Sequence, residues 1–257
     1  MKQNFKLKKE FILVGDVGNT DIKICILKSN YQIKKKIIFK NNLINFKYLE
    51  KKLKIINKYK GSVKKILLSS VVPKTYKTIK NFFEKKLSIK CYELKSIKLE
   101  KLLKIKVNRK QIGSDRIANA IAVCKKNKNF IVIDFGTATT LDVITQNIYL
   151  GGVIAPGVKL SLETLISKAT LIPEVNLSKI NKVIGNNTKT AVKSGFYWGY
   201  SGLIESLIKL IIKQTRKSFD IILTGGLAHL YKDTLNKKVK IDKDLTIKGL
   251  IKILKLF

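Results

Sequence analysis

Two carboxylates occupy equivalent places in two similar stretches of the sequence. In each stretch an aspartate, Asp16 or Asp134, ends an apolar run, and a glycine, Gly18 or Gly136, comes two residues later, followed by small hydroxylated residues. Backbone N–H groups of such a turn bind phosphate oxygens, and a carboxylate can hold the Mg²⁺ that accompanies a phosphate chain. The first stretch alone fits an ordinary hairpin with a polar tip equally well. The second copy favours two phosphate-binding turns in duplicated domains that face each other.

A third carboxylate, Asp115, stands at the start of a predicted helix, two residues after Gly113. In one interpretation Asp115 only caps the helix or interacts with the helix dipole, with Arg116 as its neighbour on the surface. In the other interpretation it projects into a cleft between the two halves. There it would act as a general base that accepts a proton from a hydroxyl group while the oxygen attacks phosphorus.

Hairpins must position Asp16 and Asp134. Residues 11–14 form a continuous apolar run, which is typical of a buried strand, and residues 22–26 alternate between apolar and polar side chains, as a returning antiparallel strand does. Residues 130–144 repeat this arrangement. The sequence therefore predicts that both aspartates lie at the end of the first strand of a hairpin.

The rest of the chain alternates between strand and helix patterns, which indicates an α/β fold. Further strands are expected over residues 31–39, 66–72, 89–94, 149–155 and 221–223. Helices are expected over residues 43–58, 73–87, 96–103, 113–126, 158–167, 189–213 and 244–256, with irregular segments over 105–112 and 170–183. In the long helix, Gly195, Gly199 and Gly202 stand beside four aromatic residues. This face predicts close helix packing, either within the core or across a dimer.

The charge of the chain is strongly positive. Its 257 residues, which suffice for one large domain or two smaller ones, carry a formal net charge of +36, and nearly all the basic residues are lysines. Such a charge attracts nucleic acids and anionic ligands alike. The lysines are scattered over every predicted surface without interleaved aromatic residues. This distribution favours a solvated surface typical of AT-rich genomes over a dedicated nucleic-acid patch.

Cysteine and histidine usage excludes several classes of site. Cys25, Cys91 and Cys124 are widely spaced in apolar surroundings, and His229 is the only histidine. We therefore expect reduced core cysteines in a cytoplasmic protein, and neither a zinc site nor a Ser-His-Asp triad. The basic start of the chain, residues 1–9, lacks an apolar signal core and predicts a short leader. No apolar run reaches the length of a membrane span.

The motifs, taken in order, resemble the type III pantothenate kinases over essentially the whole chain after the leader. The elements that carry the resemblance are Asp16-Val17-Gly18-Asn19-Thr20, Gly113-Ser114-Asp115-Arg116, Asp134-Phe135-Gly136-Thr137-Ala138-Thr139, the glycine-rich segment 151–157, Gly185-Asn186-Asn187-Thr188 and Thr224-Gly225-Gly226-Leu227-Ala228. The resemblance implies the actin-like ATPase fold: duplicated ribonuclease H-like α/β domains, expected over residues 10–127 and 128–257, with a cleft between them. It also implies a homodimer that phosphorylates pantothenate with ATP and Mg²⁺, stimulated by K⁺ or NH₄⁺, in the first step of coenzyme A biosynthesis.

The resemblance assigns roles to residues by position. Asp115 is the expected catalytic base, Asp134 the ligand of the monovalent cation and Asp16 the residue near Mg²⁺. The ATP-binding residues would be Asp16, Val17, Gly18, Asn19, Thr20, Asp21, Ile22, Lys23 and Thr137, with residues 224–226 beside the adenosine. The substrate-binding residues would be Gly113, Ser114, Asp115, Arg116 and Thr188.

One segment departs from the family pattern. Before the Gly113 motif the family usually has a tyrosine and an Asn-Pro pair, whereas this chain has Lys106, Asn108 and Arg109. A lysine in place of the tyrosine affects the expected identity of the molecule that accepts the phosphoryl group more than the expected type of reaction. Two alternatives therefore stay open here: a kinase of another small alcohol, and a transcription accessory protein derived from this family.

Overall fold

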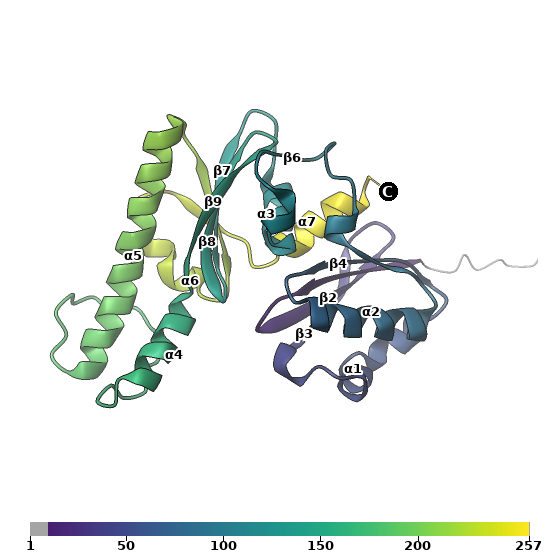
Figure 1. Cartoon of the computed structure of the whole chain (residues 1–257), viewed down its shortest axis with the longest axis horizontal. Coiled ribbons are helices and arrows are strands. Elements are labelled where there is room, and N and C mark those ends of the chain that lie inside the picture. The colour runs from purple at the N-terminus through teal and green to yellow at the C-terminus, as the bar shows by residue number, and fades with distance from the viewer. Residues whose placement is uncertain (1–9, 257) are drawn as a thin grey trace, which may run out of the picture. The chain divides into compact units, whose positions relative to one another are not determined.

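The computed structural model describes residues 10–256, which form two compact units (Figure 1). The first unit consists of residues 10–102, 108–122 and 245–256, and the second of residues 103–107 and 123–244. The predicted leader, residues 1–9, lies outside the described residues. Within the described part of the chain, no helix combines the length and the apolarity needed to cross a membrane.

The first unit is built on a mixed sheet with the strand order β3-β2-β1-β4-β5. β1, β2 and β3 form an antiparallel meander, and β4 and β5 continue the sheet parallel to β1. The strands are β1 (Phe11–Val17), β2 (Asp21–Lys28), β3 (Ile33–Lys40), β4 (Val63–Ser70) and β5 (Cys91–Glu93).

Helices cover both faces of this sheet. Leu13, Val17 and Leu68 face a core formed with α1 (Phe46–Lys52) and α2 (Pro73–Leu87). Residues that alternate with them in the strands, such as Ile12 and Leu67, face the other side. There α7 (Leu245–Leu254) packs on β1 and β4, next to α3 (Ser114–Val123). Short 3₁₀ turns complete the unit: η1 (Asn41–Leu43), η2 (Lys54–Tyr59), η3 (Leu94–Ser96) and η4 (Arg109–Gln111).

The second unit is built on a sheet with the strand order β11-β10-β7-β8-β9-β6. Its strands are β6 (Lys104–Ile105), β7 (Asn129–Phe135), β8 (Ala138–Thr145), β9 (Ile148–Pro156), β10 (Asp220–Gly225) and β11 (Val239–Ile241). The helices α4 (Val158–Lys168), α5 (Thr188–Thr215) and α6 (Ala228–Tyr231), with the turn η5 (Lys232–Thr234), lie against this sheet. Their apolar residues share one core with alternate residues of β7, β8 and β10.

The two sheets confirm the predicted duplication. Strands β3-β2-β1-β4-β5 of the first unit correspond in order and direction to β9-β8-β7-β10-β11 of the second. Asp16 pairs with Ser69 of the parallel strand β4, and Asp134 pairs with Thr224 of the parallel strand β10. The two aspartates therefore occupy the same place in two copies of one α/β unit.

The expected helix over residues 96–103 is wrong. Only the turn η3 is helical there, and the chain then runs on without regular structure. The Arg109 guanidinium donates hydrogen bonds to the carbonyl oxygens of Lys95, at 3.1 Å, and Ile97, at 2.5 Å. A helix over these residues would use the same carbonyl oxygens, so this contact favours the extended path. The predicted helix over residues 43–58 is also interrupted, because α1 ends at Lys52 and η2 follows.

Helix α7 completes the first unit although it comes last in the chain. Gly249 packs so closely on α3 that an added Cβ would overlap the backbone of Ala118. The compact units are therefore interleaved in sequence, and the division into residues 10–127 and 128–257 stays a prediction.

Candidate functional site

The first predicted phosphate loop is the tip of the β1–β2 hairpin. Asp16 is half-buried near the end of β1, opposite Lys23 of β2, and residues 18–20 form the turn. The side chains of Val17 and Ile22 are fully buried in the core, so only their backbone groups can contact a ligand. Asp21 forms an exposed ion pair of 2.9 Å with Lys40.

Two residues that the sequence analysis did not identify hold this turn. The side-chain amide of Asn41, in η1, donates to the carbonyl oxygens of Gly18, at 2.8 Å, and Asn19, at 3.2 Å. Thr75, in the first turn of α2, donates to the Asn41 side-chain oxygen at 2.7 Å. These partners are distant in sequence, and no local pattern indicates the contact.

The predicted base lies at the start of α3. Asp115 is half-buried, and its Oδ1 accepts a hydrogen bond of 2.7 Å from the backbone N–H of Arg116. Gly113 makes room for this carboxylate, because a Cβ at that position would overlap Asp115 Oδ1. Burial raises the pKa of Asp115, and this effect exceeds the opposing effects of the Arg116 N–H, the Arg116 guanidinium and Lys95. A carboxyl group with a raised pKa is suited to accept a proton near neutral pH.

Ser114 anchors the start of α3. It is completely buried, and its hydroxyl donates a short hydrogen bond to Glu93 Oε1. Val71, which follows β4, connects this segment to the first loop: its N–H donates to the Val17 carbonyl oxygen, and its Cγ1 lies 3.2 Å from the position of a Cβ on Gly113. Asp16 and Asp115 therefore both belong to the part of the first unit where the parallel strands β1 and β4 end. Carboxyl ends of parallel strands are a common place for ligands in α/β folds.

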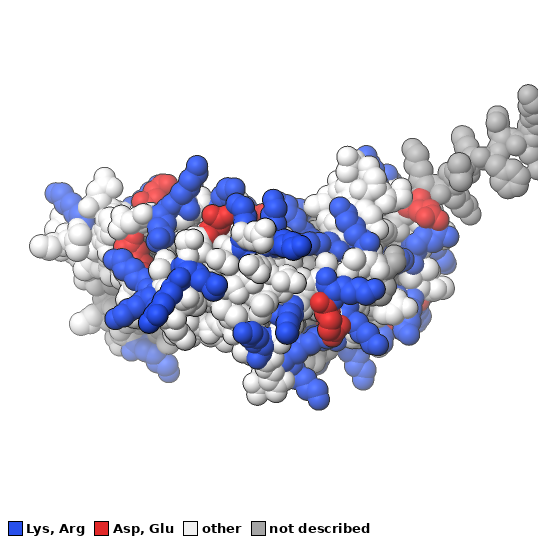
Figure 2. All heavy atoms as spheres, turned by 90° about the horizontal axis from the view of Figure 1, so that it is seen from above, with Lys and Arg blue, Asp and Glu red and all other residues white. Residues whose placement is uncertain are grey.

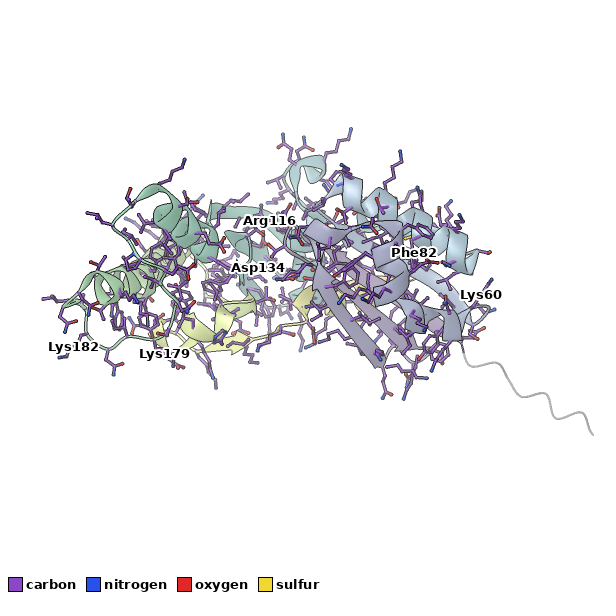
Figure 3. The ribbon with its side chains drawn as sticks, turned by 90° about the horizontal axis from the view of Figure 1, so that it is seen from below. Lys60, Phe82, Arg116, Asp134, Lys179 and Lys182 are labelled. Atoms are coloured by element: carbon purple, nitrogen blue, oxygen red, sulfur yellow. The ribbon has the colours of Figure 1, made fainter. Side chains whose placement is uncertain are left out.

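In the second unit, Asp134 is half-buried near the end of β7 (Figure 3). Gly225 makes room for it: a Cβ on this glycine would lie 2.6 Å from Asp134 Oδ1, and the φ of +87° also favours glycine. Thr137 is exposed in the turn between β7 and β8.

The Asp134 carboxylate lies beside the backbone of Gly225. A carboxylate is an oxygen ligand, a type that suits hard cations. Within residues 10–256, no group of three or more His, Cys, Asp or Glu is placed so that it could hold a metal ion.

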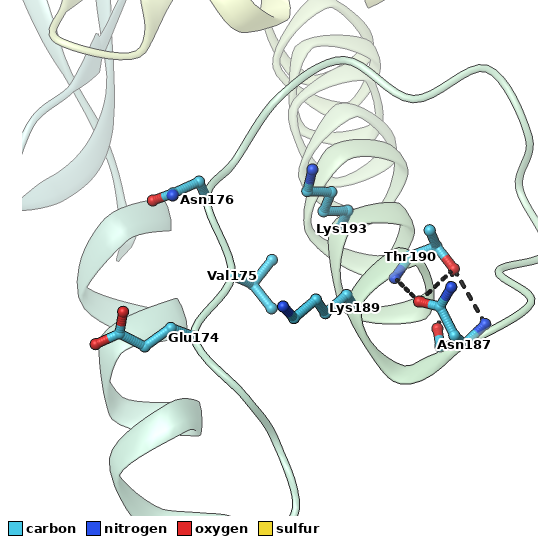
Figure 4. Close-up of a pocket in the computed structure, with 7 residues that line it drawn as sticks. All are labelled: Glu174, Val175, Asn176, Asn187, Lys189, Thr190 and Lys193. Atoms are coloured by element: carbon cyan, nitrogen blue, oxygen red, sulfur yellow. Dashed lines mark hydrogen bonds between the residues drawn. The ribbon is translucent and has the colours of Figure 1, made fainter.

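The last predicted substrate residue, Thr188, is the exposed first residue of α5. Asn187 caps the helix by accepting a hydrogen bond of 3.0 Å from the Thr190 N–H. Beside this cap lies a pocket of about 380 Å³ (Figure 4), whose lining the sequence analysis did not identify. It is formed by Glu174, Val175, Asn176, Asn187, Lys189, Thr190 and Lys193.

The glycine face of α5 is open. Among residues 10–256, no atom outside the neighbouring helix backbone lies within 4 Å of a Cβ built on Gly195, Gly199 or Gly202. Leu203 and Leu210 continue this exposed stripe along the helix. Of the two predicted kinds of packing, burial within the core of this unit is therefore wrong for the glycines.

On the face shown in Figure 2, the lysines are spread out rather than gathered in one patch. The face shown carries lysine and arginine side chains over both units, with few acidic residues between them. All three cysteines are buried, as predicted for core cysteines, and none forms a disulfide.

Comparison with known proteins identifies the family. The sequence model described as type III pantothenate kinase matches residues 12–210. A type III pantothenate kinase of Pelagibacter ubique (strain HTCC1062) is 54% identical over 241 residues, which are 94% of this chain and 97% of the relative. The chain belongs to the type III pantothenate kinase family. A second type III pantothenate kinase, from Sulfurihydrogenibium sp. (strain YO3AOP1), is 36% identical over 93% of this chain and 97% of its own length.

Solved structures share the fold of this type III pantothenate kinase family member. A protein of Campylobacter jejuni assigned to the Baf family of transcriptional activators superposes with a TM-score of 0.59 at 21% identity, covering 95% of this chain and 98% of that one. The activator of the 2-hydroxyisocaproyl-CoA dehydratase from Clostridium difficile, solved with bound ADPNP, gives a TM-score of 0.52 at 11% identity, covering 95% and 92%. At these identities the likeness shows the fold alone, and the fold is the predicted actin-like ATPase fold.

Proposed function

We propose that this chain transfers the γ-phosphoryl group of ATP to the hydroxyl group of pantothenate. The products would be ADP and 4′-phosphopantothenate, and the reaction is the first step of coenzyme A biosynthesis. The observation that carries the proposal is the 54% identity to a type III pantothenate kinase over 94% of this chain.

The ATP phosphates would be bound by the hairpin tips. In the first unit the binding segment consists of Asp16, Val17, Gly18, Asn19, Thr20, Asp21, Ile22 and Lys23, of which Val17 and Ile22 can contribute only backbone groups. In the second unit Thr137, which is exposed, would bind a phosphate oxygen, and residues 224–226 would contact the adenosine. Asp16 is an oxygen ligand of the kind that the Mg²⁺ of MgATP prefers. When bound, this ion neutralises charge on the phosphates.

Asp115 would serve as the general base. Its carboxylate would accept the proton of the pantothenate hydroxyl as the oxygen forms a bond to the γ-phosphorus, and the bond from this phosphorus to the ADP oxygen would break. Support comes from the raised pKa of Asp115 and from Gly113, which leaves space for its carboxylate. Arg116 is a suitable partner for the pantothenate carboxylate, because a guanidinium group binds carboxylates in bidentate fashion. Gly113 and Thr188 would complete the acceptor site, to which Ser114 could contribute only backbone groups because its side chain is completely buried.

Asp134 would hold a monovalent cation, K⁺ or NH₄⁺. The half-buried carboxylate and the space that Gly225 leaves beside it support this assignment. A bound monovalent cation would supply positive charge beside the phosphate-binding turn of the second unit.

We also propose a homodimer that acts in the cytoplasm. The open stripe of Gly195, Gly199, Gly202, Leu203 and Leu210 on α5 is a surface on which another helix can approach closely. An exposed apolar stripe of this kind is costly in a monomer. The three buried cysteines form no disulfide, which is consistent with a reducing compartment.

A coupled ADP-release assay with a panel of acceptors tests the reaction. We expect ADP to form only when pantothenate is present, and to form faster with K⁺ or NH₄⁺ than with Na⁺. The panel should include other small alcohols and sugars, because Lys106, at the position of the usual tyrosine, is exposed. Turnover with another acceptor but not with pantothenate would reject the proposed substrate.

A further inference from the structure

The carbonyl oxygens of the first phosphate loop converge on one residue. The side-chain amide of Asn41 donates to the carbonyl oxygens of Gly18 and Asn19, and the backbone N–H of Asn41 donates to that of Thr20 at 2.9 Å. The carbonyl oxygen of Asp21 accepts a hydrogen bond of 3.1 Å from the Gly18 N–H within the turn. All four successive carbonyl oxygens of residues 18–21 therefore have donors inside the protein.

This arrangement matters because a turn binds an anion only if its carbonyl oxygens point away from the anion. A carbonyl oxygen carries partial negative charge, so one that faced a phosphate oxygen would repel it, whereas an N–H group attracts it. Asn41 supplies donors for three of the four carbonyl groups. Without it, peptide groups of the turn would be able to rotate their oxygens outward to reach water.

Thr75 determines which way the Asn41 amide points. An amide side chain has a donor end and an acceptor end, and rotation by 180° exchanges them. The buried Thr75 hydroxyl donates to Asn41 Oδ1 at 2.7 Å. With its oxygen engaged there, the amide must present its NH₂ group to the turn. The start of α2 therefore orients Asn41, which in turn orients the loop.

We infer that Asn41 and Thr75 are positioning residues that hold the residues 18–21 turn in its phosphate-binding conformation. The inference rests on the proposed function in that the anion is taken to be the phosphate chain of MgATP. It gives Asn41, in η1, and Thr75, in α2, a role in nucleotide affinity, although neither of these two residues contacts the nucleotide in this proposal.

Nucleotide binding tests the inference without any acceptor. The probes are MgADP and a non-hydrolysable MgATP analogue, titrated by calorimetry into the full-length wild-type protein and into variants. Thr75→Val removes the hydroxyl with little change in size, and Thr75→Ser keeps it as the matched control. Asn41→Asp removes the NH₂ donor at the same size. We expect Thr75→Val to weaken nucleotide binding about three- to tenfold, Asn41→Asp to weaken it more, and Thr75→Ser to retain wild-type affinity within a factor of two.

A purely structural role would give a different pattern. It would lower the melting temperature of Thr75→Val and leave the dissociation constants of the nucleotides unchanged, and that result would overturn the inference. In steady-state assays the inference predicts a higher KM for ATP with little change in the KM for pantothenate. A wild-type protein that binds MgADP but does not phosphorylate pantothenate would reject the proposed function and leave the binding test valid.

A measurement on the wild type alone covers the case in which a variant fails to fold. In amide hydrogen exchange, MgADP should protect the N–H groups of Asn19 and Thr20. Absence of any added protection at a saturating concentration of MgADP would show that the turn does not bind the nucleotide, and would also overturn the inference.

Discussion

The substitution Asp115→Asn should lower the turnover rate and raise the stability of the fold at the same time. It replaces one carboxylate oxygen by an NH₂ group at nearly constant size. The Asn oxygen can still accept the 2.7 Å hydrogen bond from the Arg116 N–H, and the space beside Gly113 is unchanged. The variant therefore removes the proton acceptor with little change in the start of α3.

The loss of a positioned base typically costs a factor of about 10²–10⁴ in rate, which corresponds to about 3–5 kcal/mol in the activation free energy. We expect the kcat of Asp115→Asn to fall by that factor. The KM for ATP should change little, because Asp115 is not assigned to the phosphate loop.

The sign of the stability change follows from the raised pKa. Because burial raises the pKa of Asp115 in the folded state, the folded protein binds this proton more tightly than the unfolded chain does. The corresponding stability is fully present below the ordinary pKa of an aspartate, about 3.9, and is lost as the pH rises through the folded-state pKa. In its ionised form, Asp115 thus destabilises the fold. Asparagine carries no charge, so the variant should melt at a higher temperature.

The assay combines steady-state kinetics with thermal unfolding over a range of pH. The difference in melting temperature between Asp115→Asn and the wild type should shrink as the pH falls, because the protonated wild-type side chain is also neutral. For the wild type, kcat/KM should fall on the acidic side of the pH profile with an apparent pKa above the ordinary pKa of an aspartate. The variant should show no such fall. A kcat within a factor of three of the wild type would refute the role as base. A lower melting temperature at neutral pH would refute the desolvation argument.

Three further substitutions test other parts of the site. Asp134→Ala should abolish stimulation by K⁺ in an activity titration, and an unchanged titration would contradict the cation site. In a urea titration, Gly225→Ala should lower the free energy of unfolding by about 1–3 kcal/mol, because the φ of Gly225 is positive and an added Cβ would overlap Asp134. The control Gly226→Ala should have little effect, because no described atom lies within 4 Å of a Cβ at that position. Ser114→Ala should cost about 1–2 kcal/mol of stability by removing a buried hydrogen bond to Glu93, with kcat reduced less than tenfold; a larger loss of kcat would indicate direct contact with substrate.

Local signals predicted the main elements of this fold well. Helix α2 spans Pro73–Leu87, the same bounds that its proline start and apolar spacing predict. The hairpins that carry Asp16 and Asp134 were predictable for the same reason, because an apolar run, a glycine turn and a returning strand are all encoded within a short stretch. The duplication then follows from the similarity of the two stretches.

Contacts between distant residues were not predictable from local patterns. The expected helix over residues 96–103 does not form where Arg109 occupies carbonyl oxygens that a helix would use. The short strands β6 and β11 were missed because two or three residues carry no periodic signal. In the sequence, Asn41 is one polar residue among many. Only its hydrogen bonds to a turn more than twenty residues earlier connect it with the phosphate loop.

The place of α7 has a consequence for the order in which the polypeptide acquires its structure on the ribosome. The strands of the first sheet are synthesised before the second unit, yet part of one face, on β1 and β4, is covered by residues 245–254. A nascent chain therefore carries an incompletely covered face of β1 and β4 throughout the synthesis of the second unit. Completion of the first sheet must await the translation of α7, so this unit cannot finish folding before the whole second unit has been synthesised.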